Sequence, residues 1–340
     1  MIERTDVLLA DSGPQSAGAN GDRGGPDWMA RIRSLAGRYV MVLVLVLLVI
    51  IASFLYPGFL RLANLRDILT QNASVGIIAV GMTFVIISGG FDLSVGSIYA
   101  LGGTVFAGVT LHSRSVFVGA VLALASGLVA GSVNGVLVAR LRVNPFVATL
   151  GTSSAITGLA FIYSHSSPFI VKDVSFQNLA LTQIAGIPLP ILILTVVALI
   201  GAFLLSQTSF GRNVSAVGGN EQAAVLSGLR VPWLVASSYV MTGLLSALAG
   251  MMDASRLGVG QANVGATVAL DTIAMVVVGG TSLRGGEGAV WRSVVGLLIL
   301  ATLTNVFYSV NVDQNWQSIA KGVIVVVAVA LDALLRRRRG

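Results

Sequence analysis

Side chains able to carry out catalysis or hold a metal are scarce in this chain of 340 residues. It has no cysteine, so disulfides and thiolate metal sites are excluded, and its two histidines, His112 and His165, lie in short connecting segments. Two histidines rarely suffice to hold a metal ion. Neither Lys172 nor Lys321 stands in a G-x-x-x-x-G-K-[ST] phosphate-binding loop. We therefore expect a chain that is not an enzyme and binds no metal or other cofactor. If nucleoside triphosphate drives its work, another polypeptide hydrolyses it.

The composition indicates a polytopic membrane protein. Hydrophobic residues make up 55% of the chain and charged residues only 10%, with a mean hydropathy of +0.88, whereas a soluble globular protein carries about 25% charged residues. The net charge of +7 does not indicate a nucleic-acid partner, because the arginines flank apolar segments, as is typical of membrane topology. Arg336–Arg339 directly follow the last apolar segment and are expected to contact anionic membrane lipid.

Ten apolar segments recur along the chain, several at or below the roughly 20 residues that a membrane-spanning helix needs. They lie at 39–57, 72–89, 94–111, 116–139, 146–163, 188–205, 233–252, 266–280, 289–309 and 317–335. The segments around Gly89 and Gly280 are short and end in Gly-Gly, which indicates broken or re-entrant helices. We expect an all-α membrane protein with about ten transmembrane helices, or eight or nine if some are re-entrant, in one domain over residues 31–340. Residues 1–30 lack apolar periodicity and are expected to form a disordered cytoplasmic tail.

The distribution of basic residues predicts the orientation. Ten spans put both termini on one side, and if that side is the cytoplasm, 15 of the 21 Lys and Arg residues lie inside. The remaining six, outside, are Arg61, Arg66, Arg114, Lys172, Arg256 and Lys321. This bias has the expected direction. It places a polar insert, Thr208–Arg230, in the cytoplasm.

The polar insert carries the signals of a short helix. Asn220 is placed to cap it, Glu221 lies in its first turn, where the helix dipole favours an anion, and Gly228 is placed to close its C-terminus. A helix of fewer than about 12 residues is marginal alone in water. We therefore expect it to pack against the rest of the chain or in the groove of a partner, with an ordinary interfacial loop as the alternative.

Two further patterns involve glycine, which occurs 40 times. Gly127, Gly131 and Gly135 are spaced by four, which favours close helix packing within the chain, with a homodimer seam as the alternative. The segments Ile87–Gly103 and Val277–Gly296 are similar, since each is an apolar run, a Gly-Gly break, a polar turn and another apolar run. Matching interrupted segments in two halves point to a transport site, although chance similarity between glycine-rich segments is equally open.

Four blocks of sequence, in this order, resemble the permease (transmembrane) subunit of ribose-, xylose- and arabinose-type ABC importers. They are GGFDLSVGS (Gly89–Ser97), NGVLVARLRVNPFVATLGT (Asn134–Thr152), SFGRNVSAVGGNEQAAVLSG (Ser209–Gly228) and LDTIAMVVVGGTSLRGGEG (Leu270–Gly288). The resemblance covers roughly residues 40–335 and leaves out the first 30. Phe91 stands where these permeases commonly have isoleucine.

The resemblance implies the ABC importer permease fold. It also implies that the chain imports a monosaccharide (a pentose, hexose or related polyol) across the inner membrane of a bacterium. The implied partners are ABC ATPase subunits that bind ATP and Mg on the inner side, an extracytoplasmic sugar-binding protein, and a second permease copy in a homodimer or related heterodimer. The alternative is a stand-alone secondary transporter or channel for small polar solutes. That class would want ionisable groups well inside the bilayer, where this chain has few.

In this family the insert corresponds to a coupling helix that sits in a groove of the ATPase. The resemblance implies that Gly218 and Gly219 allow a tight turn and that Ala223 and Ala224 offer a small contact face. The implied ATPase-coupling residues are Gly211, Arg212, Gly218, Gly219, Asn220, Glu221, Ala223, Ala224 and Gly228.

A sugar pathway needs fixed polar groups and an apolar or aromatic face, and for each candidate helix packing is the alternative role. The candidates are Asn72, Thr83, Asp92, Asn134, Phe146, Thr149, Thr152, Asp271 and Asn305. A carboxylate at mid-bilayer costs about 2.5–3.5 kcal/mol on insertion scales, so the two aspartates need a partner or water. Asp92 is placed to cap the next helix or to line the pathway or a gate near its inner end. Asp271 is placed to cap the apolar run that it begins or to recognise a sugar hydroxyl.

Overall fold

The computed structural model describes residues 27–337, so the expected tail lies outside the described residues except for its last four, which belong to the first helix. The chain divides into two compact units, residues 1–40 and 41–340, and the packing described below is that of the second unit.

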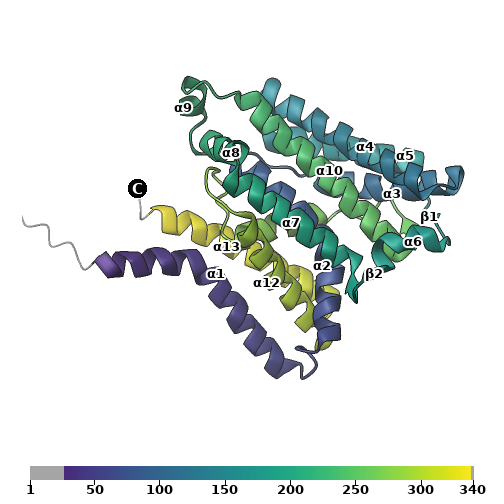
Figure 1. The fold of residues 1–340 in the computed structure, drawn as a ribbon, viewed down its shortest axis with the longest axis horizontal. Coiled ribbons are helices and arrows are strands. Elements are labelled where there is room, and N and C mark those ends of the chain that lie inside the picture. Colours follow the sequence, from purple (N-terminus) through teal and green to yellow (C-terminus); the bar gives the residue numbers. More distant parts are fainter. Residues whose placement is uncertain (1–26, 338–340) are drawn as a thin grey trace, which may run out of the picture. The chain divides into compact units, whose positions relative to one another are not determined.

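Helices dominate the described residues, as expected (Figure 1). They are α1 (Asp27–Leu55), α2 (Leu62–Ile87), α3 (Val95–Ser113), α4 (Val116–Gly135) with a π-helical end (Val136–Arg140), α5 (Pro145–Tyr163), α6 (Val174–Leu181), α7 (Leu189–Gln207), α8 (Ser209–Gly219), α9 (Glu221–Leu226), α10 (Val231–Leu257), α11 (Val268–Val278), α12 (Val290–Ser309) and α13 (Gln314–Arg337). Two antiparallel pairs of two-residue strands join β1 (Phe169–Ile170) to β4 (Val259–Gly260) and β2 (Gln183–Ile184) to β3 (Ile187–Pro188).

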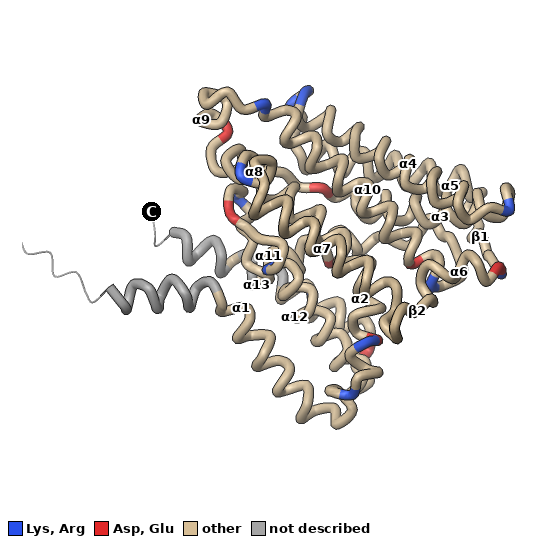
Figure 2. Tube along the Cα trace, in the orientation of Figure 1, with Lys and Arg blue, Asp and Glu red and all other residues tan. Residues whose placement is uncertain are grey.

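Seven helices in the described part of the chain are long and apolar enough to cross a membrane: α2, α3, α4 with its π-helical end, α5, α7, α10 and α12. Two apolar helical stretches, Tyr39–Leu55 and α11, are shorter. The chain is therefore a multi-pass helical membrane protein, while the number of ten spans stays a prediction. Figure 2 shows Lys and Arg gathered at helix ends and connecting segments, as the topology requires.

The two interrupted segments differ in length but end in the same way. The helix before the first break was expected to be short, and this is wrong, because α2 begins at Leu62 and runs for 26 residues. The helix before the second break, α11, has only 11 residues, about 16 Å at 1.5 Å per residue, half a bilayer core. In each, a glycine with positive φ (Gly89 at 87°, Gly280 at 93°) follows the last turn. The amide of this glycine donates to the carbonyl three residues earlier, and the amide of the following residue donates to the carbonyl five residues earlier. This pair of bonds is a Schellman motif. The internal similarity therefore extends to the backbone.

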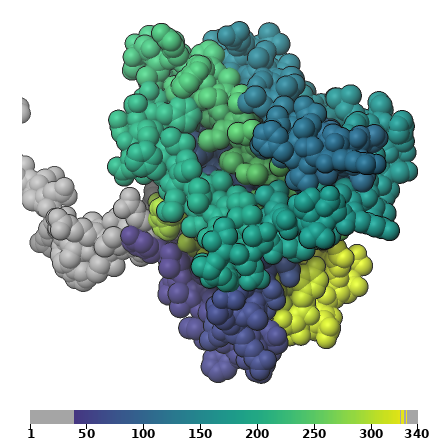
Figure 3. All heavy atoms as spheres, turned by 45° about the vertical axis from the view of Figure 1, so that its right-hand side comes forward, coloured from purple at the N-terminus to yellow at the C-terminus, as the bar shows by residue number. Residues whose placement is uncertain are grey.

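Glycines let α10 pack closely on its neighbours. A methyl group placed on Gly131 of α4 would lie 2.6 Å from the carbonyl oxygen of Tyr239, and one placed on Gly243 of α10 would lie 2.5 Å from that of Gly127. In Figure 3, blue atoms of the α4–α5 region lie beside green atoms of α10. The glycine spacing thus serves helix packing within the chain, as favoured, and the homodimer seam is the wrong interpretation of these residues.

We expect Gly131→Ala to lower the melting temperature of the detergent-solubilised protein, because the added methyl would overpack the α4–α10 contact by about 1–3 kcal/mol. Gly158→Ala on α5 is the matched control, since nothing lies within 4 Å of its added methyl. It should melt at the wild-type temperature or above, because alanine favours a helix over glycine. Equal melting temperatures for the two variants would contradict the packing.

Candidate functional site

The polar insert folds into two short helices at the end of α7. Asn220 caps α9, its side-chain oxygen accepting from the amide of Ala223 at 2.9 Å, and Glu221 opens the first turn. Gly228, with φ of 78°, closes the helix, as the amide of Leu229 donates to the carbonyl of Ala224 at 3.1 Å. The predicted caps at Asn220 and Gly228 and the first-turn position of Glu221 are therefore confirmed.

The contact face expected on α9 is partly wrong. Ala224 is only 4% exposed and packs in a cluster with Val214 and Val217 of α8 and Leu234 of α10. Ala224 therefore faces its own chain, because a helix of six residues must bury one face to be held in place. The outward positions are Gln222, Ala223, Val225 and Leu226. Leu226 is 88% exposed, so it, and not Ala224, is available to a partner.

Gly218 and Gly219 do not form the tight turn that the sequence suggested. Both lie in the last turn of α8, and the chain turns at Asn220. Gly211, at the start of α8, is needed for a close approach, since a methyl there would lie 2.2 Å from the carbonyl oxygen of Leu205. Arg212 and Arg230 are exposed beside α8 and α9.

The insert lies at one end of α10 and a second group of short elements at the other. α9 packs near the start of α10, whereas α6 packs near its C-terminal end, where the Ser255 hydroxyl donates to the Phe176 carbonyl at 2.7 Å (Figure 1). Because α10 is long enough to span a bilayer, these two groups lie at opposite ends of a candidate membrane span.

Several candidate pathway residues form one buried hydrogen-bond network. Asp92 Oδ1 accepts from the Ser94 amide at 2.9 Å and from its hydroxyl at 2.6 Å, and Asn134 Nδ2 donates to Ser94 Oγ at 2.7 Å. Thr152 Oγ1 then donates to Asn134 Oδ1 at 2.7 Å, and Thr149 Oγ1 accepts from the Leu93 amide. The network joins the break after α2 to α4 and α5.

The expectation that Asp92 caps α3 is wrong. Its carboxylate bonds to the residue that precedes the helix, forming an Asx turn, and reaches none of the first helical amides. Its second oxygen, Oδ2, is buried without a hydrogen-bond partner among the described residues. Asp92 lies in the break between α2 and α3.

The other candidates lie apart from this network. Asn72 donates to the Ile68 carbonyl of its own helix. Phe146 is 55% exposed. Thr83 on α2 shares a 2.7 Å hydrogen bond with Ser293 of α12. Asn305 pairs with Asn64, near the start of α2, at 2.9 Å.

Asp271 forms an ion pair, where capping was expected. Its Oδ1 lies 3.8 Å from Lys321 Nζ of α13, and both side chains are partly buried. The predicted partner for this carboxylate therefore exists, and it is a charge on a neighbouring helix. The pair ties α11 to α13.

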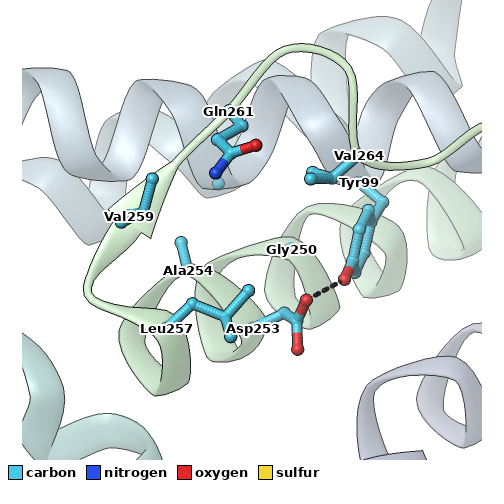
Figure 4. A pocket seen from close by; sticks show the side chains of 9 residues that line it. Tyr99, Gly250, Asp253, Ala254, Leu257, Val259, Gln261 and Val264 are labelled. Carbon is cyan, nitrogen blue, oxygen red and sulfur yellow. Dashed lines mark hydrogen bonds between the residues drawn. The ribbon is translucent and has the colours of Figure 1, made fainter. Parts of the chain in front are cut away.

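A second polar cluster, at the far end of α10 from the insert, escaped the sequence analysis. The Tyr99 hydroxyl of α3 donates to Asp253 Oδ2 (Figure 4). Arg256 Nε donates to Asp253 Oδ1 at 3.0 Å. The cavity beside them, about 10 Å³, borders Gly250 and Gln261. That volume is at the lower limit for one water molecule. The Asp-x-x-Arg spacing at the end of an apolar segment was the available signal.

An apolar groove of about 470 Å³ runs between α3, α4 and α5. Its walls include Leu101, Leu122, Val129, Thr152, Ile156 and Leu159. Thr152 connects the groove to the buried network through Asn134, so the groove offers an apolar face with a polar group behind it.

We expect Asn134→Leu to lower the melting temperature, because it removes the amide group that Ser94 and Thr152 share, at about 0.5–1.5 kcal/mol for each lost hydrogen bond. Ser132→Ala is the control and should melt like the wild type, because this position on the same helix is partly exposed and its hydroxyl bonds to its own helix. A wild-type melting temperature for Asn134→Leu would show that the network does not hold these helices together.

Comparisons with known proteins agree with this architecture. The family model described as "Branched-chain amino acid transport system / permease component" matches residues 64–329. The ribose import permease protein RbsC of Bacillus subtilis is 40% identical over 290 residues, 85% of this chain and 90% of that protein. RbsC of Escherichia coli K12 is 38% identical over 309 residues, covering 90% and 94%.

The L-arabinose transport system permease protein AraH of Escherichia coli K12 is 35% identical over 295 residues, 87% of this chain and 90% of that protein. No solved structure matches the chain. The resemblance drawn from the four sequence blocks is thereby confirmed, and this chain belongs to the family of transport-system permease components that the matching model describes.

Proposed function

We propose that this chain is the membrane-spanning permease subunit of an ATP-driven importer that carries a monosaccharide, a pentose, hexose or related polyol, into a bacterial cell. The observation that carries the proposal is the α8–α9 insert, which is anchored on its own chain and presents an almost fully exposed leucine at one end of α10. The family description names branched-chain amino acids, but the relatives that cover most of the chain are ribose and arabinose permeases. These relatives favour a sugar.

The outer face of α9 is the surface that we assign to the ATPase. Ala224 holds the helix on α8 and α10, and the caps at Asn220 and Gly228 fix both ends without help from a partner. The pair Val225 and Leu226, 53% and 88% exposed, is left as a small apolar knob. A pre-formed knob loses little conformational entropy on docking.

The charges around the knob indicate the chemistry of its socket. Two arginines, Arg212 on α8 and Arg230 after α9, and one acid, Glu221 at the start of α9, are exposed, and Figure 2 shows blue and red segments beside α8 and α9. An apolar pocket with an acidic rim would complement this surface. Among the residues first assigned to coupling, this leaves Ala223, Glu221 and Arg212 on the surface and gives Gly211, Gly218 and Ala224 internal packing roles.

The rest of the assembly follows from the same proposal. The ATPase binds ATP and Mg and this chain binds no cofactor, while an extracytoplasmic sugar-binding protein delivers the substrate near α6 and the Asp253 cluster. Both termini lie in the cytoplasm. A second permease copy, identical or related, completes the pathway, and Thr152, Asn134 and Thr149 are its best-placed polar groups because the buried network brings them together.

We expect proteoliposomes to take up radiolabelled ribose or arabinose only when this chain is reconstituted with its ATPase, its binding protein and ATP. Leu226→Glu should abolish both uptake and ATPase co-purification, because a carboxylate cannot enter an apolar socket without a cost of several kcal/mol. The matched control is Val174→Glu on α6, 72% exposed at the opposite end of α10, which should retain the ATPase.

Three outcomes would count against the proposal. Uptake by the chain alone would favour a stand-alone transporter or channel. Uptake of leucine in place of a sugar would restore the substrate that the family description names. Normal ATPase recovery with Leu226→Glu would show that α9 is not the docking helix.

A further inference from the structure

The two interrupted segments of the chain meet directly beneath the end of α8. The carbonyl of Ile87, the last residue of α2, accepts a hydrogen bond of 2.9 Å from the amide of Gly286, in the loop between α11 and α12. Thus the break after α2 and the loop after α11 satisfy each other's backbone groups. The bond matters because Ile87 is fully buried, and a buried backbone carbonyl without a partner is costly.

Gly218 of α8 fits against both segments at once. A methyl group placed on Gly218 would lie 1.7 Å from the Ile87 oxygen and 2.7 Å from the Gly286 nitrogen. One placed on Gly285 would lie 3.1 Å from the α-carbons of both Gly218 and Gly89. Three backbones therefore touch with no side chain between them, and any residue larger than glycine at 218 must push α8 away from the other two.

Further contacts bind the same parts together one turn away. The hydroxyls of Thr83 on α2 and Ser293 on α12 share a hydrogen bond of 2.7 Å, so the two segments are joined below the glycine contact as well. The ring of Phe210 on α8 stacks on Phe84 of α2 with centroids 6.1 Å apart. The junction, meaning the contact of Gly218 with Ile87 and Gly286, is therefore supported by contacts one turn away on each helix.

The junction is continuous with the surface assigned to the ATPase. Only Asn220 separates α8 from α9, and Ala224 of α9 packs in the same apolar cluster as Val214 and Val217 of α8. A displacement of α9 must therefore carry the end of α8 with it. The cluster also includes Ile87, the residue that Gly218 touches.

We propose that Gly218 is a positioning residue that lets α8 contact both interrupted segments. A movement of α9 driven by the ATPase then displaces the α2–α3 and α11–α12 breaks together, as one unit. This inference rests on the proposed function and assigns the internal route by which that function is driven. Gly219 supplies a matched comparison, because a methyl there would lie 4.0 Å from its nearest neighbour, the Gly286 α-carbon.

The test compares Gly218→Ala with Gly219→Ala in the complete complex with ATPase and binding protein in proteoliposomes. Complex yield, ATP hydrolysis and sugar transported per ATP are measured. For Gly218→Ala we expect an assembled complex that hydrolyses ATP, with sugar per ATP lowered by about tenfold or more, the factor that corresponds to roughly 1.4 kcal/mol of misfit. Weakened helix formation would not explain this loss, since alanine favours a helix. Gly219→Ala should transport like the wild type.

A second variant keeps the inference testable if Gly218→Ala does not assemble. The chain has no cysteine, so Thr83→Cys with Ser293→Cys can be oxidised to a single disulfide that locks the two interrupted segments to each other. If they move as one unit, the cross-linked complex should keep wild-type sugar per ATP.

Two results would overturn the inference. One is wild-type coupling in Gly218→Ala, and the other is loss of transport on cross-linking that reductant reverses, which would show that the two segments separate during the cycle. Failure of the wild-type complex to bind its ATPase or to transport sugar would instead count against the proposed function.

Discussion

A backbone that leaves the helical conformation inside a membrane protein must find hydrogen-bond partners within the protein, because the surrounding hydrocarbon offers none. This chain interrupts its helices twice, after Ile87 and after Val278. Each interruption closes its own helix with a Schellman motif, and the bond from the Gly286 amide to the Ile87 carbonyl then joins the two. The position of α8, the buried polar network and the location of the insert all follow from where these interruptions meet.

The cost of polar groups in the bilayer explains the rest of the interior. Asp92, Ser94 and Asn134 are buried and bonded to one another just beyond the first interruption. Asp271, in the first turn of the second interrupted helix, is paired with Lys321. Small residues bring α10 into close contact with α4 and α2. The protein therefore combines polar groups near its breaks with a rigid frame of closely packed helices.

Local features of the sequence were predicted correctly, because they depend on neighbouring residues alone. Asn220, Glu221 and Gly228 mark the ends of α9 by their own side-chain and backbone chemistry, and the spacing of Gly127 and Gly131 indicates a close-packed face. Which face of a short helix is buried depends on segments distant in the sequence. Ala224 was therefore wrongly placed on the contact face.

The contacts that span the greatest separation in sequence were beyond prediction. The role of Gly218 depends on Ile87 and Gly286, and the Tyr99–Asp253 bond joins residues on two helices far apart in the chain. No local sequence pattern indicates such pairs. The positions of the helices along the chain were therefore predicted far better than the contacts between them. Helix α2 also begins earlier than its apolar segment, 72–89, suggested, because polar residues such as Asn64 extend it beyond the apolar stretch.

Contact between α9 and an ATPase requires that α9 lie on the cytoplasmic side of the membrane, and this can be measured directly. The chain has no cysteine, so Leu226→Cys and Val174→Cys each provide a single thiol for a membrane-impermeant maleimide. We predict that Cys at 226 reacts only in inside-out vesicles and Cys at 174 only in intact spheroplasts. Labelling of position 226 in intact spheroplasts would place the insert outside and contradict its contact with an ATPase.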